Sequence, residues 1–197
     1  MPRYFCRLCD SSNNWKYPSG AAIETICSHF GKFGFAYEEW NFNEKLRFEG
    51  FQHGWLEAFK PMRGHRHVPL GSHEIALYVR RGGNSYFVGR IEGCENISGT
   101  DLQKPYPSEF AGCANRFGCV VLVGNNLWQV SPIITGSRVQ QYTQIPYSNM
   151  RFSVGSVSFA RSASLINLNY KRYGALLVDG YPQREELWKS LPDLLRS

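Results

Sequence analysis

The sequence predicts an α+β fold that is mostly β, a small curled sheet or barrel with a few peripheral helices. The first observation is the recurrence of short apolar segments of strand-like composition, at residues 1–8, 55–59, 74–79, 86–91, 119–123, 127–130, 152–159 and 175–178. The second is that glycine and asparagine occupy the breaks between several of them. The third is the small number of helical segments, at residues 21–30, 108–117 and 184–195. Short strands joined by tight turns favour one small sheet that curls on itself, or a barrel.

The first strands lie in an irregular part of the chain. Residues 1–8 alternate weakly and predict a strand, and residues 21–30 predict a short helix that Gly31 ends. Residues 55–59 predict a further strand, closed by Pro61.

Two hairpins are predicted farther along. Residues 74–79 and 86–91 flank the turn at residues 82–84, Gly-Gly-Asn, which gives the clearest hairpin in the chain. The next two apolar segments flank residues 124–126, Gly-Asn-Asn, and predict a second one.

Length and composition are those of one soluble domain. The chain has 197 residues and a mass of 22.5 kDa, with 43% apolar and 19% charged residues. We expect a single domain over residues 1–197, with residues 1–14 as an N-terminal strand or arm and residues 184–197 carrying a C-terminal helix. No apolar run approaches the roughly 20 residues of a spanning helix, and no signal-peptide core precedes the first strand. The expectation is a cytoplasmic protein that has no membrane partner.

The charge balance favours a polyanionic partner. Lys and Arg number 22 against 16 Asp and Glu, which gives a net charge of +6, and aromatic residues make up 15% of the chain. Basic surfaces attract phosphates, and rings beyond those that fill the core can stack on bases. Lys60, Arg63 and the run at residues 65–67 form a compact basic loop, for which a merely solvated loop is the alternative. The predicted DNA contacts are Lys16, Arg63, His65, Arg66, His67, Lys104, Tyr106 and Arg151.

Residues 33–43, FGFAYEEWNFN, interleave rings with carboxylates and amides. A ring can sandwich an unpaired or flipped base while a carboxylate or amide binds the polar edge of that base. The predicted base pocket consists of Trp15, Tyr37, Glu38, Glu39, Trp40 and Asn41. The alternative is that the rings fill the core while the acids form ion pairs with nearby arginines.

Cysteines and histidines do not predict a metal or a cofactor. Cys6 and Cys9 form a C-x2-C pair. Cys27 and His29 would bring the number of ligands to the four of a Cys3His zinc site. Cys-Ser-His is a poor second pair, because the backbone would have to fold back sharply to present both ligands. Ordinary reduced cysteines are therefore expected.

A nuclease within this chain is the less favoured hypothesis. Tyr78 and the Tyr86–Gly89 stretch distantly echo the GIY-YIG pattern, but Ala76 replaces its first glycine and the spacing is short. Glu57 and Lys60 do not have the spacing of a carboxylate-lysine metal site, and the His-Arg-His run lacks the other residues of an HNH site. No catalytic residue is predicted.

Several phrases together resemble a known group of domains. They are Trp15–Gly20 (WKYPSG), residues 34–43 (GFAYEEWNFN), residues 54–57 (GWLE), residues 86–91 (YFVGRI) and residues 150–154 (MRFSV). They resemble modified-DNA reader domains attached to HNH endonucleases in bacterial defence proteins, similar in layout to the PUA superfamily with its SRA, YTH and EVE modules. Ala36-Tyr37 stands where that family has Gly-His, so the chemistry that reads the base edge differs here.

The resemblance implies a reader that turns a modified base into an aromatic pocket, at the positions Trp15, Tyr37, Glu38, Glu39, Trp40 and Asn41. We therefore expect a DNA-binding module for modified duplex DNA, with cleavage supplied by a nuclease domain or subunit outside this sequence. An endonuclease in its own right and a protein-interaction module are the alternatives. The sequence leaves the modification open, including phosphorothioate, for which Tyr106-Pro107 would offer an apolar platform.

Overall fold

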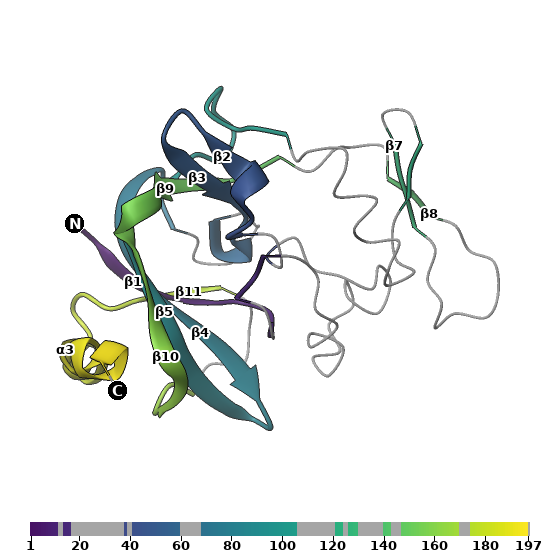
Figure 1. Ribbon diagram of the computed structural model, residues 1–197. Helices are drawn as coiled ribbons and strands as arrows, with labels where there is room; N and C mark the ends of the chain where they lie inside the picture. The colour runs from purple at the N-terminus through teal and green to yellow at the C-terminus, as the bar shows by residue number, and fades with distance from the viewer. Residues whose placement is uncertain are drawn as a thin grey trace.

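The computed structural model describes residues 1–11, 14–16, 38, 41–59, 68–105, 121–123, 126–129, 140–142, 147–169 and 174–196. Figure 1 shows a long curled sheet with one helix, α3, beside it. The sheet has eight strands, with β10 paired to β5 outside the path β11-β1-β4-β5-β9-β3-β2. These strands are β1 (Arg3–Arg7), β2 (Arg47–Phe48), β3 (Phe51–Gly54), β4 (Gly71–Arg81), β5 (Asn84–Asn96), β9 (Met150–Ser153), β10 (Val157–Ile166) and β11 (Ala175–Leu177). An α+β, mostly β fold is thus confirmed, and in the described residues the sheet is open, since its end strands β11 and β2 do not pair with each other.

The hairpin of β4 and β5 is the centre of the sheet, as the sequence predicts. Arg81 pairs with Asn84 across a loop of two glycines. Gly82 and Gly83 both have positive φ, 54° and 86°, which a two-residue loop of this twist requires and which only glycine adopts without strain.

β5 changes partner along its length, and this change makes the sheet curl. Its first part pairs with β10 and its last two residues pair with β9. Between these parts the register against β4 shifts, and Gly93 has a φ of 64°. The 3-10 helix η5 (Val154–Ser156) separates β9 from β10, so the single strand predicted at residues 152–159 is wrong at its centre.

The strand predicted at residues 55–59 is also wrong, because Glu57–Phe59 form the 3-10 helix η4. A side chain from a distant part of the chain hydrogen-bonds the backbone groups that a strand would use to pair with its neighbour. The Asn149 amide bonds both N–H and C=O of Leu56, at 2.8 Å each. A second 3-10 helix, η3 (Glu44–Leu46), precedes β2 and has Asn43 as its N-cap.

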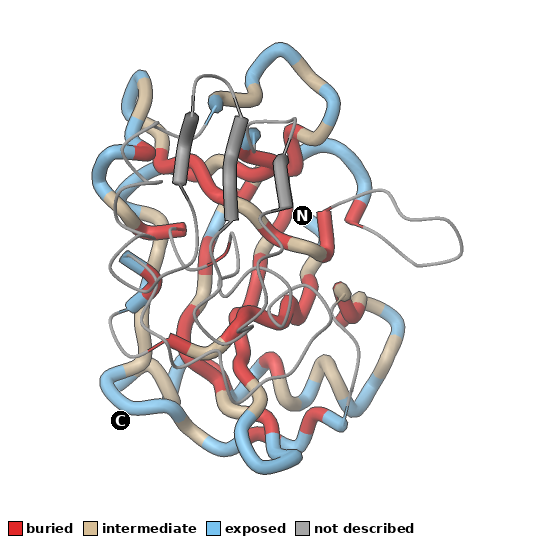
Figure 2. Tube along the Cα trace, turned by 90° about the vertical axis from the view of Figure 1, so that its right-hand side faces the viewer, coloured by how far each residue is buried: buried red, intermediate tan, exposed pale blue. Residues whose placement is uncertain are grey.

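The central strand β4 is buried on both faces, and Figure 2 shows buried residues along the strands and exposed turns between them. One core contains Ile75 and Leu77 of β4, and the other contains Tyr78 of the same strand. Trp188 and Leu191 bring α3 (Pro182–Arg196) onto the second core. The predicted C-terminal helix is confirmed.

Three further strands form a separate antiparallel sheet: β6 (Val121–Val123), β7 (Asn126–Gln129) and β8 (Gln140–Tyr142). β6 and β7 confirm the second predicted hairpin, whereas β8 was not predicted. The helices predicted at residues 21–30 and 108–117 lie outside the described residues. No helix in the described ranges is long and apolar enough to cross a membrane.

Candidate nucleic-acid interface

The carboxylate of Glu38 joins three parts of the chain inside the protein. Its Oε2 accepts a hydrogen bond from the Cys9 N–H at 2.7 Å, and its Oε1 accepts one from the Glu57 N–H at 3.3 Å. Burial raises the pKa of Glu38 to about 7, although both amides and the nearby Arg7 act in the opposite direction. Glu38 is therefore a structural anchor whose charge state changes near neutral pH.

Asn41 is the second anchor of the same segment. Its side chain is fully buried, and it donates to the Trp55 C=O at 2.8 Å and accepts from the Trp55 N–H at 2.7 Å. Gly54 lies against it so closely that an added Cβ would stand 2.8 Å from the Asn41 Oδ1. The Asn41 N–H also bonds the Glu38 C=O at 3.1 Å, which joins the two residues to each other.

Trp15 packs beside these anchors with 3% of its surface exposed. Its Nε1 donates to the Cys9 C=O at 2.8 Å, its ring stacks on Phe159, and the edge of Phe42 meets it. We name Trp15, Glu38 and Asn41, with their partners, the Glu38 anchor.

The structure thus brings together three of the six predicted pocket residues, and it turns their polar groups toward protein backbone. Hydrogen bonding and packing alone account for these three residue types. A role in contacting a base stays a prediction for Trp15, Glu38 and Asn41. Tyr37, Glu39 and Trp40 lie outside the described residues.

A second polar group lies across three neighbouring strands. His53 on β3 is the partner of Arg151 on β9, and Arg151 is the partner of Glu95 on β5. Directly opposed residues project to the same face of a sheet. The Arg151 Nε donates to Glu95 at 2.9 Å, and its guanidinium lies 4.5 Å from the centroid of the Phe51 ring.

His53 connects this row to Lys104. The His53 Nδ1 lies 3.3 Å from the Ser148 Oγ, and that oxygen accepts a hydrogen bond from the Lys104 N–H at 2.9 Å. Burial, with Arg151 and Lys104 adding positive charge, lowers the pKa of His53 to about 4. With this pKa the imidazole is neutral at pH 7. We name Phe51, His53, Glu95, Lys104 and Arg151 the His53 face.

Two of the predicted DNA contacts, Arg151 and Lys104, are therefore both linked to His53, Arg151 as its strand partner and Lys104 through Ser148. The Lys104 Nζ lies 3.9 Å from Glu49, with both side chains reaching solvent. Lys16 is exposed, and its C=O accepts a hydrogen bond from the Asn43 side chain. The other predicted contacts lie outside the described residues: Arg63, His65, Arg66, His67 and Tyr106.

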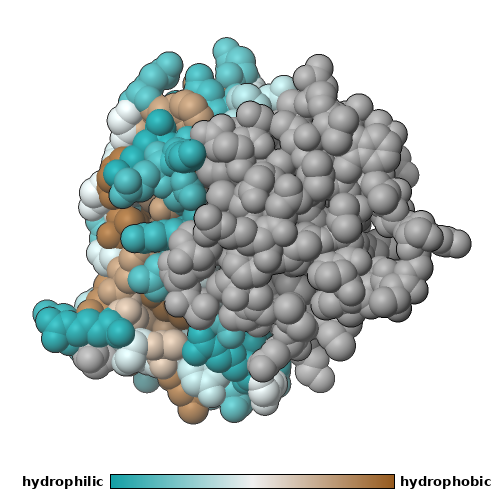
Figure 3. Space-filling view, turned by 45° about the vertical axis from the view of Figure 1, so that its right-hand side comes forward, coloured by the Kyte–Doolittle hydropathy of each residue, from teal (hydrophilic) through white to brown (hydrophobic). Residues whose placement is uncertain are grey.

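Sequence reasoning missed His53 and Phe51. Their i, i+2 spacing on a short strand was a weak signal. The two residues stand out only in the folded protein, where Arg151, about a hundred residues later in the chain, pairs with His53. In Figure 3, the part of the surface that is coloured is a mosaic of hydrophilic and hydrophobic residues.

The cysteines that the structure describes are structural. Cys6, Cys9 and Cys94 are buried, and burial raises the pKa of the Cys6 and Cys94 thiols. Within the described ranges no three His, Cys, Asp or Glu side chains are grouped to hold a metal ion. Cys27 and His29 lie outside those ranges.

Comparisons with protein-family models, with curated proteins and with solved structures found no match.

Proposed function

We propose that this protein is a DNA-binding module that reads a modified base, or a modified backbone, in duplex DNA and serves modification-dependent restriction or defence in the cytoplasm. The observation that carries the proposal is that Arg151 is the strand partner of the buried His53, and that the Lys104 backbone is linked to the same histidine through Ser148. Arg151 and Lys104 are two cations that sequence reasoning selected for phosphate contact, from segments far apart in the chain.

Arg151 suits a phosphate contact. Its guanidinium is planar, it rests against the Phe51 ring, and 20% of its side chain reaches solvent. Only Glu95 pairs with it among the described residues, and donors of the guanidinium fork remain for a phosphate oxygen. Lys104 adds a second positive charge, which also acts on the pKa of His53.

The Glu38 anchor supports base reading in a different way. Glu38 and Asn41 are held by backbone partners, and the two residues between them in the sequence are Glu39 and Trp40. In the proposal, Trp40 stacks on the extruded base and Glu39 binds its polar edge, and their neighbours Glu38 and Asn41 are held by backbone partners before binding. Neighbours that are held beforehand lower the entropy lost on binding.

Titration of matched duplexes tests the proposal. Fluorescein-labelled duplexes that are plain, methylated, hydroxymethylated or phosphorothioated are titrated at several salt concentrations. We expect at least tenfold tighter binding to one modified duplex and an affinity that falls with salt. Equal affinity for all four duplexes would overturn the reader function, and cutting of any duplex by the pure protein with magnesium would replace it with a nuclease.

Single variants test whether the predicted base pocket reads the modification. Trp40→Ala is expected to abolish the preference for the modified duplex while leaving binding to the plain duplex intact. Leu165→Ala is the matched control, because Leu165 is 65% exposed on β10 and its loss also removes exposed apolar surface. A Trp40→Ala protein that keeps the full preference would remove the pocket from the proposal.

A further inference from the structure

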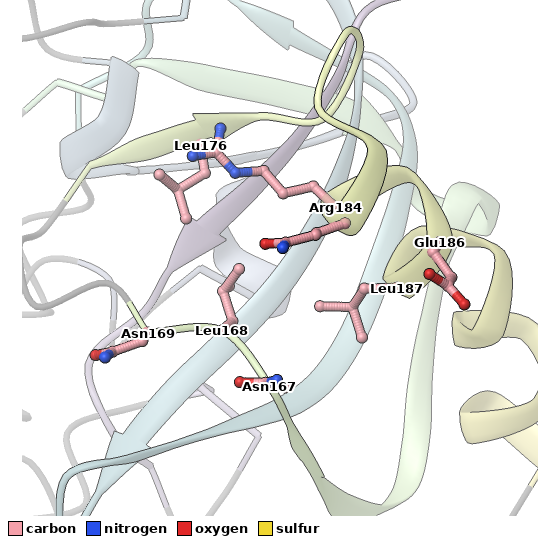
Figure 4. Close-up of a pocket in the computed structure, with 8 residues that line it drawn as sticks. Asn167, Leu168, Asn169, Leu176, Arg184, Glu186 and Leu187 are labelled. Atoms are coloured by element: carbon pink, nitrogen blue, oxygen red, sulfur yellow. The ribbon is translucent and has the colours of Figure 1, made fainter.

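A cavity of about 540 Å³ lies where the chain leaves β10 and where α3 begins. Figure 4 shows its walls, which come from the segment after β10, from β11 and from the first turns of α3. The lining residues are Asn167, Leu168, Asn169, Leu176, Gln183, Arg184, Glu186 and Leu187. Its volume falls within the range of roughly 300–1,000 Å³ that is typical of small-molecule sites.

Arg184 is held in place and has no acid partner among the described residues. Its Nη1 donates to the Leu177 C=O at 2.8 Å, and its guanidinium lies 4.1 Å from the centroid of the Tyr181 ring. Other partly buried arginines, such as Arg3 and Arg151, each pair with a carboxylate, whereas none does so with Arg184 in the part of the chain described. A fixed cation without a counter-ion, at the wall of a cavity, favours an anionic ligand.

The remaining lining divides into amides and leucines. Asn167, Asn169 and Gln183 carry both donors and acceptors, and in the described residues no side-chain hydrogen bond uses them. Leu168 and Leu176 are each 8% exposed and supply apolar wall. A ligand with a flat, partly apolar body and donor and acceptor groups at its edge fits such a lining.

The one acid of the lining does not oppose an anion at Arg184. In Figure 4 the Glu186 carboxylate lies on the far side of Leu187 from the Arg184 guanidinium. The two charged groups are therefore separated by Leu187, and the anionic group of a ligand belongs beside Arg184.

We propose that this cavity binds a nucleoside monophosphate group. Arg184 binds the phosphate, the leucines contact the base, and the amides bond its edge. The group can be a free nucleotide or the terminal nucleotide of a strand, since both present the same phosphate, sugar and base. The site uses residues of β11 and α3 that the proposed reader function does not use.

Calorimetric titration tests the site directly. The probes are the common ribo- and deoxynucleoside 5′-monophosphates, the matching nucleosides, inorganic phosphate and a 5′-phosphorylated oligonucleotide. At least one monophosphate is expected to saturate one site, with both its nucleoside and inorganic phosphate at least tenfold weaker. Tighter binding of the oligonucleotide assigns the strand end, and tighter binding of the mononucleotide assigns the free ligand. No saturable binding by any nucleotide, or equal binding of inorganic phosphate, would overturn the proposal.

Variants place the ligand in this cavity. Arg184→Gln should weaken nucleotide binding at least tenfold, whereas Lys189→Gln should not, because Lys189 is exposed on the same helix and does not line the cavity. Asn169→Trp fills the exposed rim without removing charge and should also block binding, which keeps the test valid if Arg184→Gln unfolds. Unchanged affinity in a folded Arg184→Gln or in Asn169→Trp would place the ligand elsewhere. Duplex binding by Lys104 and Arg151 is measured separately, so either proposal can fail without the other.

Discussion

The Glu38 anchor and the His53 face use similar residue types in opposite ways. Each contains an ionisable group whose pKa burial shifts, and each has an aromatic ring beside it. In the anchor, polar side chains bond the backbone of distant segments. On the face, charged side chains bond one another and still reach solvent, with 20% of Arg151 and 30% of Glu95 exposed.

The difference teaches where recognition chemistry can reside. A side chain whose hydrogen bonds all go to backbone holds the fold, and its loss leaves buried groups without partners. A partly exposed cation against a ring keeps donors for a ligand. We therefore expect anchor variants to change stability and face variants to change affinity.

The largest effect is expected at Asn41. Asn41→Ala leaves the N–H and C=O of Trp55 without their amide partner and should lower the free energy of unfolding by about 4 kcal/mol. Asn43→Ala is the control, because it removes a half-exposed helix cap and should cost only about 1 kcal/mol. Urea unfolding measures both. An Asn41→Ala loss no larger than that of Asn43→Ala would break the distinction between anchor and surface.

The two shifted groups should oppose each other in the pH dependence of stability. Glu38 has a pKa of about 7 instead of 4.5, so its contribution is complete below pH 4.5 and is lost as pH rises through 7. His53 has a pKa of about 4 instead of 6.5, so its contribution is present above pH 6.5 and is lost as pH falls through 4. Between these limits the slopes have opposite signs.

Single variants should separate those slopes. In Glu38→Gln, stability should rise by about 3 kcal/mol from pH 4 to 6.5, the contribution of His53 alone. In His53→Asn, stability should fall by about 3 kcal/mol from pH 4.5 to 7, the contribution of Glu38 alone. Denaturant titrations at half-unit pH steps measure both. If both variants keep the wild-type profile, the two shifts do not exist.

A smaller effect is expected on DNA affinity at Arg151. Arg151→Gln should weaken duplex binding about tenfold and flatten its salt dependence by about one counterion. Glu95→Gln should tighten binding about threefold, because it releases Arg151 from its ion pair. Fluorescence anisotropy at several salt concentrations measures both. Two variants with the same affinity as wild type would exclude the His53 face from the interface.

The smallest effect is expected at Lys104. Its ammonium is exposed and lies near Glu49, so Lys104→Gln should weaken duplex binding only about threefold. Lys189→Gln, on the exposed side of α3, is the control and should leave affinity unchanged. Equal losses in the two variants would indicate that net charge alone, and not this face, attracts DNA.

Features encoded by neighbouring residues could be predicted. The β4–β5 hairpin follows from two glycines between apolar runs, and α3 follows from its own apolar pattern. The 3-10 helix at Glu57–Phe59 could not be predicted, because Asn149 reaches Leu56 from 93 positions away. The change of partner along β5 likewise depends on β9 and β10, which come more than fifty residues later.

The candidate site follows the same division. The sequence identified Glu38 and Asn41 as unusual and selected Arg151 and Lys104 for their charge. It did not indicate that Cys9 and Trp55 bind Glu38 and Asn41, or that His53 is the strand partner of Arg151. Hydrogen-bond partners and burial are properties of segments that meet only after folding.

The sequence by itself determined a basic, ring-rich, mostly β chain with its central hairpin and its last helix, because charge is additive and turns are set by local backbone sterics. Tertiary structure alone decided which acids and rings are enclosed and which cations share a face. The physical reason is that desolvation and hydrogen bonding depend on what surrounds a group, and in a curled sheet most of those surroundings come from distant strands.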